Sequence, residues 1–155
     1  MRGKRAPKRE IAADPKYGRL DIAKFTNYLM SDGKKTTARA VMYDCLDIIS
    51  NKTKRNPVEV FDIAIKNVGP SLEVRGKRVG GANYQIPYPV RAERRFTLAC
   101  RWIIEAANKK KGKPMSVRLA DEIMLASEEQ GEAFKKKLDA HKMAEANRAF
   151  AHFAR

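Results

Sequence analysis

Apolar side chains recur at helical spacing along most of this 155-residue chain. The first such stretch begins at Leu20 and stops at Ser31-Asp32-Gly33, and the second runs from about Lys35 to Lys54. Spacing of i, i+3, i+4 and i+7 is typical of a helix that buries one face. In the second helix the predicted buried stripe consists of Ala38, Val41, Met42, Cys45, Leu46 and Ile49.

The same spacing predicts four more helices. The third starts at Asn56-Pro57, a favourable N-cap and N1 pair, and ends at Gly69-Pro70. The fourth precedes the basic loop "NKKKGKP", and the fifth runs from Met115 to about Gln130. The sixth begins at Glu132. Predicted inward-facing residues are Val58, Phe61, Ile65 and Val68 in the third helix, Phe96, Ala99, Cys100, Ile103 and Ala107 in the fourth, Leu119, Ile123 and Ala126 in the fifth, and Phe134, Leu138 and His141 in the sixth.

Between the third and fourth helices the period changes from helical to alternating. The stretch "VRGKRVGGANYQIPYPVRAERR" reads as two short strands joined at Gly80-Gly81, a pair that tolerates the positive φ of a tight hairpin turn. Pro87 and Pro89 cannot donate backbone hydrogen bonds, so the second strand stays a sheet edge. The predicted fold is therefore mainly α: about six helices with one protruding β-hairpin over residues 72–90, in a single domain of residues 1–155 whose residues 1–19 form an extended basic tail.

A formal net charge of +15 is the unusual feature of the composition. Self-repulsion at that charge favours a polyanionic partner. Cys45 and Cys100 lie within apolar helical patterns and are predicted to be buried thiols in a reducing compartment. No apolar run approaches the roughly 20 residues that span a bilayer, and no signal-peptide core is present, so we expect a cytoplasmic protein with no membrane partner.

The chain offers little catalytic chemistry. It lacks phosphate-binding loops of the GxxxxGK[ST] and GxGxxG types, and Ser31-Asp32-Gly33-Lys34 fits SxxK only within a helix-ending turn. His141 and Glu145 could face one metal ion, but no third ligand lies near them. The acidic pair Asp121-Glu122 is predicted to lie on the solvated face of the fifth helix. We expect no catalytic residues, no metal site and no cofactor.

The cations instead fall in blocks at element ends, which is the footprint of a nucleic-acid binder if the blocks converge. Basic β-arms also occur in DNA-bending proteins, whereas dispersed blocks plus a tail suit a folded RNA read by shape. Tyr84 and Tyr88 share one face of the second strand and could stack on bases or cover the helices beneath. Lys135–Lys137 are interpreted as a solvated helix end in preference to a nucleic-acid contact.

Three segments together resemble the family of ribosomal protein seven of the bacterial small subunit. They are "RVGGANYQIPYPVRAERR", the helix over Leu98–Ile104 and the ending "HKMAEANRAFAHF". The tail, "DGKKTTA" and "NPVEV" also fit, so the resemblance spans essentially the whole chain. It implies a helical bundle with a protruding hairpin. It further implies binding to the 3′ major domain of small-subunit rRNA, initiation of head assembly, and a position near the exit-site tRNA and the platform, beside ribosomal protein eleven.

The resemblance and the charge pattern together give the expected site residues. Some bacterial members also repress their own messenger RNA, which is a further candidate partner. The DNA-architectural interpretation is the rival, and an RNA-modifying enzyme is a distant third. Expected rRNA-binding residues are Arg2, Lys4, Arg5, Lys8, Arg9, Lys34, Lys35, Arg75, Lys77, Arg78, Arg91, Arg94, Arg95, Lys109, Lys110 and Lys113. Residues expected at the hairpin tip, near tRNA and the platform, are Arg78, Gly80, Gly81, Asn83 and Tyr84.

Overall fold

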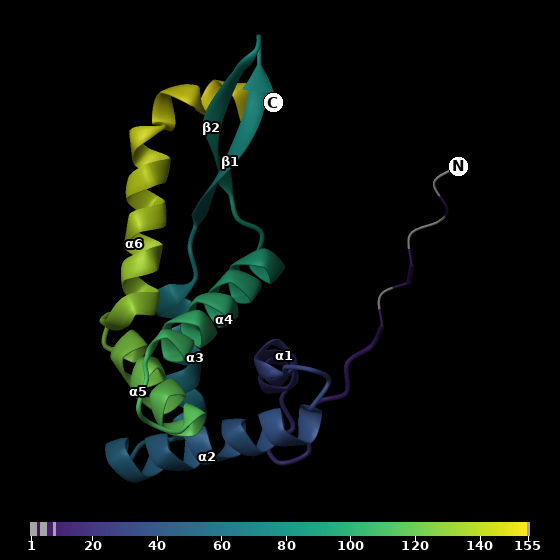
Figure 1. The fold of residues 1–155 in the computed structure, drawn as a ribbon, viewed down its shortest axis with the longest axis vertical. Helices are drawn as coiled ribbons and strands as arrows, with labels where there is room; N and C mark the ends of the chain where they lie inside the picture. Colours follow the sequence, from purple (N-terminus) through teal and green to yellow (C-terminus); the bar gives the residue numbers. More distant parts are fainter. Residues whose placement is uncertain (1–2, 4–5, 8, 155) are drawn as a thin grey trace. The chain divides into compact units, whose positions relative to one another are not determined.

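The computed structural model describes residue 3, residues 6–7 and residues 9–154 (Figure 1). The predicted tail contacts Arg2, Lys4, Arg5 and Lys8 therefore lie outside the described residues. The chain forms two compact units, Met1–Ala40 and Val41–Arg155. The single domain expected from the sequence stays a prediction. None of the helices in the described ranges is long and apolar enough to cross a membrane.

The first unit carries a turn and one complete helix. At the turn, the N–H of Gly18 donates to the Asp14 carbonyl at 2.7 Å, and Gly18 adopts a positive φ of 65°. Helix α1 (Leu20–Leu29) follows, with an ion pair between Arg19 and Asp21 at its start. Ile22 and Phe25 are fully buried. The predicted stop is confirmed, because Asp32 and Gly33 both adopt positive φ.

Helix α2 (Lys35–Thr53) begins in the first unit and continues into the second. Its predicted stripe is confirmed: Ala38, Met42, Cys45, Leu46 and Ile49 are buried, and Val41 is half-buried. Burial raises the pKa of the Cys45 thiol to about 12, with a smaller contribution from the charge of Asp121. Cys100 is also buried and free, so both thiols are core residues, as predicted.

Helix α3 (Pro57–Val68) begins where the sequence places it, since the Asn56 side chain accepts the N–H of Val58 at 3.1 Å. Its buried face is rotated slightly from the prediction: Val60, Phe61, Ala64 and Val68 are buried, whereas Val58 and Ile65 are half-buried. Helix α5 (Met115–Ser127) packs on α3, and the Asn67 amide donates to the carbonyls of Ala126 and Ser127, both at 3.1 Å. An α3 side chain thus satisfies the last carbonyl groups of α5.

Helix α4 (Ala92–Lys109) buries the predicted Ala99, Cys100, Ile103 and Ala107. In helix α6 (Gly131–Ala146) the predicted stripe is wrong at Leu138, which is 43% exposed. Ala133 and Ala144 are the buried residues instead, and α6 packs against the hairpin as well as against α4. Small alanine side chains allow this close approach, so spacing of large residues alone misjudged the buried face. The last described segment is the 3-10 helix η1 (Arg148–Ala154).

The β-hairpin lies between α3 and α4, as predicted. Strands β1 (Leu72–Val79) and β2 (Ala82–Pro89) pair antiparallel, with Val79 opposite Ala82. Gly80 and Gly81 have φ of 57° and 90°, as a two-residue hairpin turn of type I′ requires. Figure 1 shows the hairpin extending away from the start of α4, with α6 alongside it and η1 beside its outer half. The mainly α fold with one protruding hairpin is confirmed.

The acidic pair of α5 departs from its predicted environment. Asp121 is half-buried and pairs with Lys52 of α2, with Nζ 2.8 Å from Oδ1. Glu122 is fully buried, so the predicted solvated position is wrong for this residue. A buried carboxylate requires compensating partners. Those partners come from the α4–α5 connection and from the start of α6.

Candidate nucleic-acid interface

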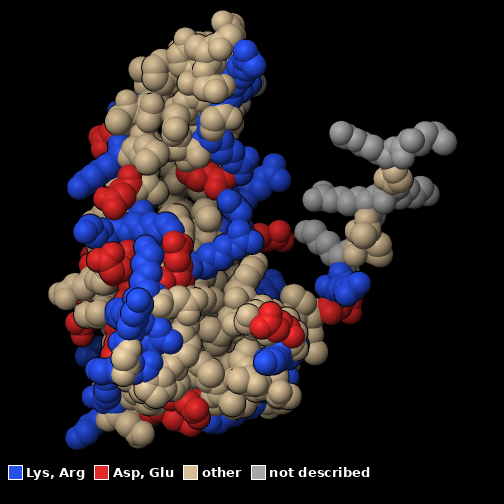
Figure 2. Space-filling model, in the orientation of Figure 1, with Lys and Arg blue, Asp and Glu red and all other residues tan. Residues whose placement is uncertain are grey.

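Three arginines gather around a groove at the base of the hairpin, on the second unit. The groove has a volume of about 590 Å³ and is lined by Arg75, Tyr88, Pro89, Val90, Arg91 and Arg94. We call it the hairpin-base groove. Figure 2 shows Lys and Arg surface following one side of the hairpin down to the start of α4. The groove therefore combines concentrated positive charge with one aromatic ring.

Strand geometry brings part of this set together. Side chains alternate across a strand, so Glu73, Arg75 and Lys77 point to the same face of β1. Glu73 lies directly opposite Tyr88 in the register. Arg75, two residues further along, places its guanidinium carbon 5.6 Å from the centre of the Tyr88 ring. This distance is within the range of a cation–π contact.

Glu73 organises two of the three arginines. Its Oε2 accepts from Arg94 Nε at 3.2 Å, and its Oε1 accepts from Arg75 Nε at 2.6 Å. Burial by itself would raise the pKa of Glu73, but its hydrogen bonds to Arg75 and Arg94 and their charges outweigh that effect and lower the pKa below its usual value. Glu73 is therefore ionised at neutral pH and fixes the two guanidinium groups beside the groove. Glu73 was not among the predicted site residues, although a lone acid within a basic strand is a usable signal.

The third arginine stands at the start of α4. Arg91 is the N-cap residue of the helix, and no side chain caps the first turn. Val90 donates its N–H to the Ser71 carbonyl at 2.9 Å, which fixes the junction between strand and helix. Arg91 is exposed and forms no ion pair with an acidic residue of the described chain. The positive charge of Arg91 and the positive end of the α4 dipole therefore both attract an anion to this position.

Arg95, predicted to belong to the same basic set, has a different environment. Its Nε donates to the Gly69 carbonyl at 3.1 Å, and a longer bond of 3.5 Å reaches the Lys66 carbonyl. These carbonyl groups belong to the C-terminal end of α3. Arg95 therefore acts as a cap for α3, and rRNA contact by this residue stays a prediction.

At the tip, the expected residues separate into two groups. Arg78, Gly80, Gly81 and Asn83 are exposed. Tyr84 is half-buried, and its ring centre lies 5.1 Å from that of Phe150 and 5.4 Å from that of Phe153. Of the two interpretations left open for Tyr84, the structure supports covering over base stacking. Lys77 also faces this segment, because its Nζ donates to the Phe153 carbonyl at 2.9 Å.

The remaining predicted cations are dispersed. Arg9, Lys34 and Lys35 are exposed residues of the first unit. In the loop after α4, Lys109 lies 3.9 Å from Glu105, Lys110 pairs with Glu122, and Lys113 is exposed. The hairpin-base groove thus brings together Arg75, Arg91 and Arg94, and it does not include the other predicted residues.

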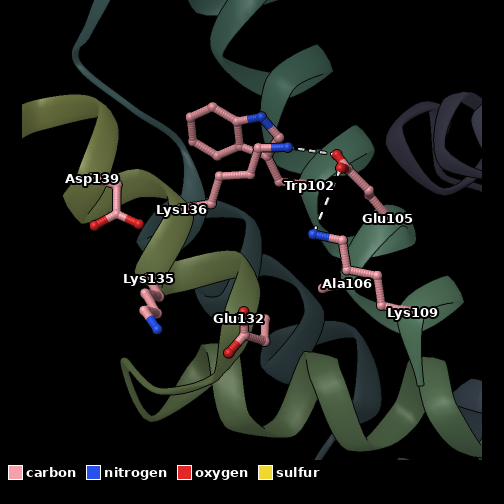
Figure 3. Close-up of a pocket in the computed structure, with 8 residues that line it drawn as sticks. All are labelled: Trp102, Glu105, Ala106, Lys109, Glu132, Lys135, Lys136 and Asp139. Carbon is pink, nitrogen blue, oxygen red and sulfur yellow. Dashed lines mark hydrogen bonds and ion pairs between the residues drawn. The ribbon is translucent and has the colours of Figure 1, made fainter. Parts of the chain in front are cut away.

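A second pocket of about 330 Å³ lies between α4 and α6 (Figure 3). Figure 3 shows Lys136 reaching across the indole of Trp102 toward Glu105, and Nζ lies 2.5 Å from Oε2. That hydrogen bond, followed by the charges of Lys136 and Lys109, lowers the pKa of Glu105. Three acids balance three lysines in the lining, which is Trp102, Glu105, Ala106, Lys109, Glu132, Lys135, Lys136 and Asp139. The pocket is therefore less suited to a polyanion than the hairpin-base groove.

His141 and Glu145 were considered as metal ligands. His141 Nε2 lies 3.1 Å from the Ser71 backbone nitrogen and accepts its N–H. Burial, then the charges of Lys137 and Arg95, lower the pKa of His141, so the imidazole is neutral at pH 7. Among the described residues no group of three or more His, Cys, Asp or Glu side chains could hold a metal ion.

This chain is similar to known proteins along nearly its whole length. Residues 1–148 match the family described as Ribosomal protein S7p/S5e. The small ribosomal subunit protein uS7 of Thermotoga maritima is 56% identical over 153 residues, covering 99% of each chain. The proteins of the same name from Bordetella petrii and Cupriavidus necator are 53% and 51% identical over 152 residues, covering 98% of this chain and 97% of theirs.

Proposed function

Because this chain belongs to the ribosomal protein S7p/S5e family, we propose that it is a structural, RNA-binding constituent of the small ribosomal subunit. Relatives that match over nearly their full length carry the name of a small-subunit protein. The family is a structural class of ribosomal protein, which supports a role other than catalysis. The working location is then the ribosome in the cytoplasm of a bacterial cell.

The hairpin-base groove is the observation that carries the proposal at the level of residues. Arginine donates several hydrogen bonds in a planar fork that matches phosphate oxygens. Arg91 is the N-cap of α4 and Arg94 lies in its first turn, and Arg75 faces the same groove from β1. Tyr88 adds a ring on which a base can stack. The groove thus fits a phosphate backbone with an unpaired nucleotide.

The finer assignments follow from the family resemblance. We propose that the chain binds the 3′ major domain of the small-subunit rRNA and initiates assembly of the head. The exposed tip, with Arg78 and Asn83, then lies near the exit-site tRNA and the platform, beside ribosomal protein eleven. The chain's own messenger RNA is a further candidate ligand.

An electrophoretic competition tests the proposal with the full chain. An rRNA fragment of the head is expected to be bound in preference to duplex DNA of equal length at physiological salt. Equal affinity for the two would refute the ribosomal proposal and favour the DNA-architectural rival.

Variants locate the interface. Arg91→Ala combined with Arg94→Ala is expected to weaken RNA binding. The fall of log K with log salt should also become less steep, by about 0.7–0.9 for each phosphate that is no longer neutralised. Lys142→Ala is the control for each single arginine replacement, because it also removes one positive charge and Lys142 is an exposed lysine of α6 outside the groove. An unchanged slope in the double variant, or an equal loss of affinity in the control, would place the interface elsewhere.

A further inference from the structure

The connection between α4 and α5 contains both exposed lysines and one lysine, Lys110, whose side chain is partly buried. Lys110 ends α4 as its C-cap residue, Gly112 turns the chain with a φ of 84°, and Pro114 is the N-cap of α5. Lys111 and Lys113 stand exposed on either side of Gly112, and neither pairs with an acidic residue of the described chain. Lys110, in contrast, is half-buried.

Two residues of α5 hold Lys110 at both of its ends. The Arg118 guanidinium donates to the Lys110 carbonyl and also to the carbonyls of Ala107 and Asn108, both at 3.3 Å. The Glu122 carboxylate forms an ion pair with the other end, with Lys110 Nζ 2.6 Å from Oε2. Arg118 and Glu122 are four residues apart, so they lie on the same face of α5. Their combined effect is to fix the backbone and the side chain of Lys110.

Glu122, which pairs with Lys110, also contacts the start of α6. Glu122 Oε1 accepts the N–H of Ala133 at 2.9 Å. Gly131 adopts a φ of 91°, and a Cβ there would lie 2.9 Å from Glu122 Oε1. A glycine at this position therefore leaves the space in which the carboxylate reaches both partners.

Burial makes the inward position of Lys110 the stable one. The Glu122 side chain is fully buried, and removing Lys110 to bind a phosphate would leave a buried carboxylate without a counterion. Leaving one partner of a buried pair uncompensated is strongly unfavourable. Lys110 is thus unavailable as an RNA ligand, although the sequence grouped it with its neighbours.

We propose that Glu122 and Arg118 are positioning residues for an RNA-binding loop, in which Lys111 and Lys113 contact phosphate and Lys110 serves as the internal tether. This inference rests on the proposed RNA-binding function and names residues that act on RNA without touching it. It has a consequence opposite to simple electrostatics. Removal of the negative charge of Glu122 should weaken RNA binding, whereas loss of a negative charge from a basic protein ordinarily strengthens it.

The test compares two variants of the full chain that change the charge equally. Glu122→Gln keeps the shape of the side chain and loses the ion pair, and it is expected to weaken binding to the head rRNA fragment by about two- to tenfold, the lower part of the range for coupled residues. Glu128→Gln is the control, because Glu128 is exposed at the end of α5. It is expected to leave the affinity unchanged or slightly higher. Equal or tighter binding by Glu122→Gln would overturn the inference.

A mutant cycle and a measurement without RNA separate this inference from the proposed function. In a chain that carries Lys111→Ala and Lys113→Ala, Glu122→Gln should cause no further loss of affinity; an undiminished loss would show that Glu122 does not act through the loop. Without RNA, amide hydrogen exchange at residues 111–113 should become faster in Glu122→Gln. Unchanged exchange would overturn the positioning role even if the wild type binds rRNA. Should Glu122→Gln fail to fold, Arg118→Lys, which keeps the charge and loses the fork, carries the same expectations.

Discussion

Replacing Arg95 with Ala should lower the free energy of unfolding of the protein. Its effect on the affinity for RNA should be smaller. The main loss is the hydrogen bond from Arg95 Nε to the Gly69 carbonyl, at 3.1 Å. A hydrogen bond to a charged group contributes about 1.5–3 kcal/mol, and the exposure of Arg95 favours the lower half of that range. A cation near a helix C-terminus adds about 0.3–1 kcal/mol, part of which is the same interaction. We therefore expect a loss of about 2 kcal/mol, combining these two contributions.

Thermal unfolding followed by far-ultraviolet circular dichroism measures this loss. A chain of this size shifts in Tm by about 2–4 °C per kcal/mol, so Arg95→Ala should melt about 4–8 °C lower. Arg95→Lys keeps the charge but not the planar fork, so its Tm should lie between those of the wild type and Arg95→Ala. Arg91→Ala is the comparison variant: because Arg91 is exposed at the N-cap, its loss should lower RNA affinity while Tm stays nearly constant.

The partner of Arg95 provides an independent check. A Cβ on Gly69 would lie 2.8 Å from both Cγ and Nε of Arg95, and the φ of Gly69 is −64°, which alanine adopts without strain. Gly69→Ala should therefore destabilise mainly by displacing Arg95, and its effect should shrink in an Arg95→Ala background. Additive effects, or an Arg95→Ala variant with unchanged Tm and a large loss of RNA affinity, would refute the capping role.

Three further outcomes follow from other contacts. Arg94→Ala should raise the pKa of the Glu73 carboxyl toward its usual value, because Arg94 is one of the two cations that lower it; a carbon-13 NMR titration with an unchanged Glu73 pKa would contradict this arrangement. The folded-state pKa of His141 lies below 6.5, so the unfolded chain binds more protons and stability should fall as pH drops below about 6.5. His141→Gln, whose side chain accepts the Ser71 N–H without titrating, should flatten the difference in Tm between pH 7.5 and 5.5, and an identical pH dependence would exclude His141 as its source. Tyr84→Ala should cost about 1–2 kcal/mol, since an aromatic contact contributes about 0.5–1.5 kcal/mol beyond its buried area, and should speed amide exchange in η1, whereas Tyr84→Phe should behave like the wild type; protected η1 amides in Tyr84→Ala would show that the ring does not hold η1.

Much of the fold was predictable because local rules and the tertiary structure agree. The N-cap at Asn56, the stripe of α2 and the Gly80-Gly81 turn each depend on residues close together in the chain. The prediction was less accurate for α6, where small alanines rather than the larger Leu138 face the rest of the protein. Periodicity identifies apolar faces by their large residues, so a face built for close approach gives a weaker signal.

The candidate site was predictable only in part. Arg75, Arg91 and Arg94 were expected to bind RNA, and the structure gathers them around one groove. The organising role of Glu73 depends on the hydrogen bond to Arg94, which lies 21 residues further along the chain. The charge pattern of the sequence shows where cations occur. Which of them form ion pairs within the protein, and which stay available to a ligand, depends on the packing of the fold.

The sequence by itself determined the order of the helices, the hairpin and its turn, the strong positive charge and the membership of a ribosomal protein family. Each of these features depends on local spacing, on composition or on similarity along the whole chain. Only the tertiary structure decided the roles of individual charged residues. Arg95 caps a helix end that lies 26 residues earlier, and Glu122 is buried because Lys110 and the start of α6 meet it. The physical reason is that a charged side chain is stabilised by whichever groups the fold brings opposite to it, and those groups are remote in sequence.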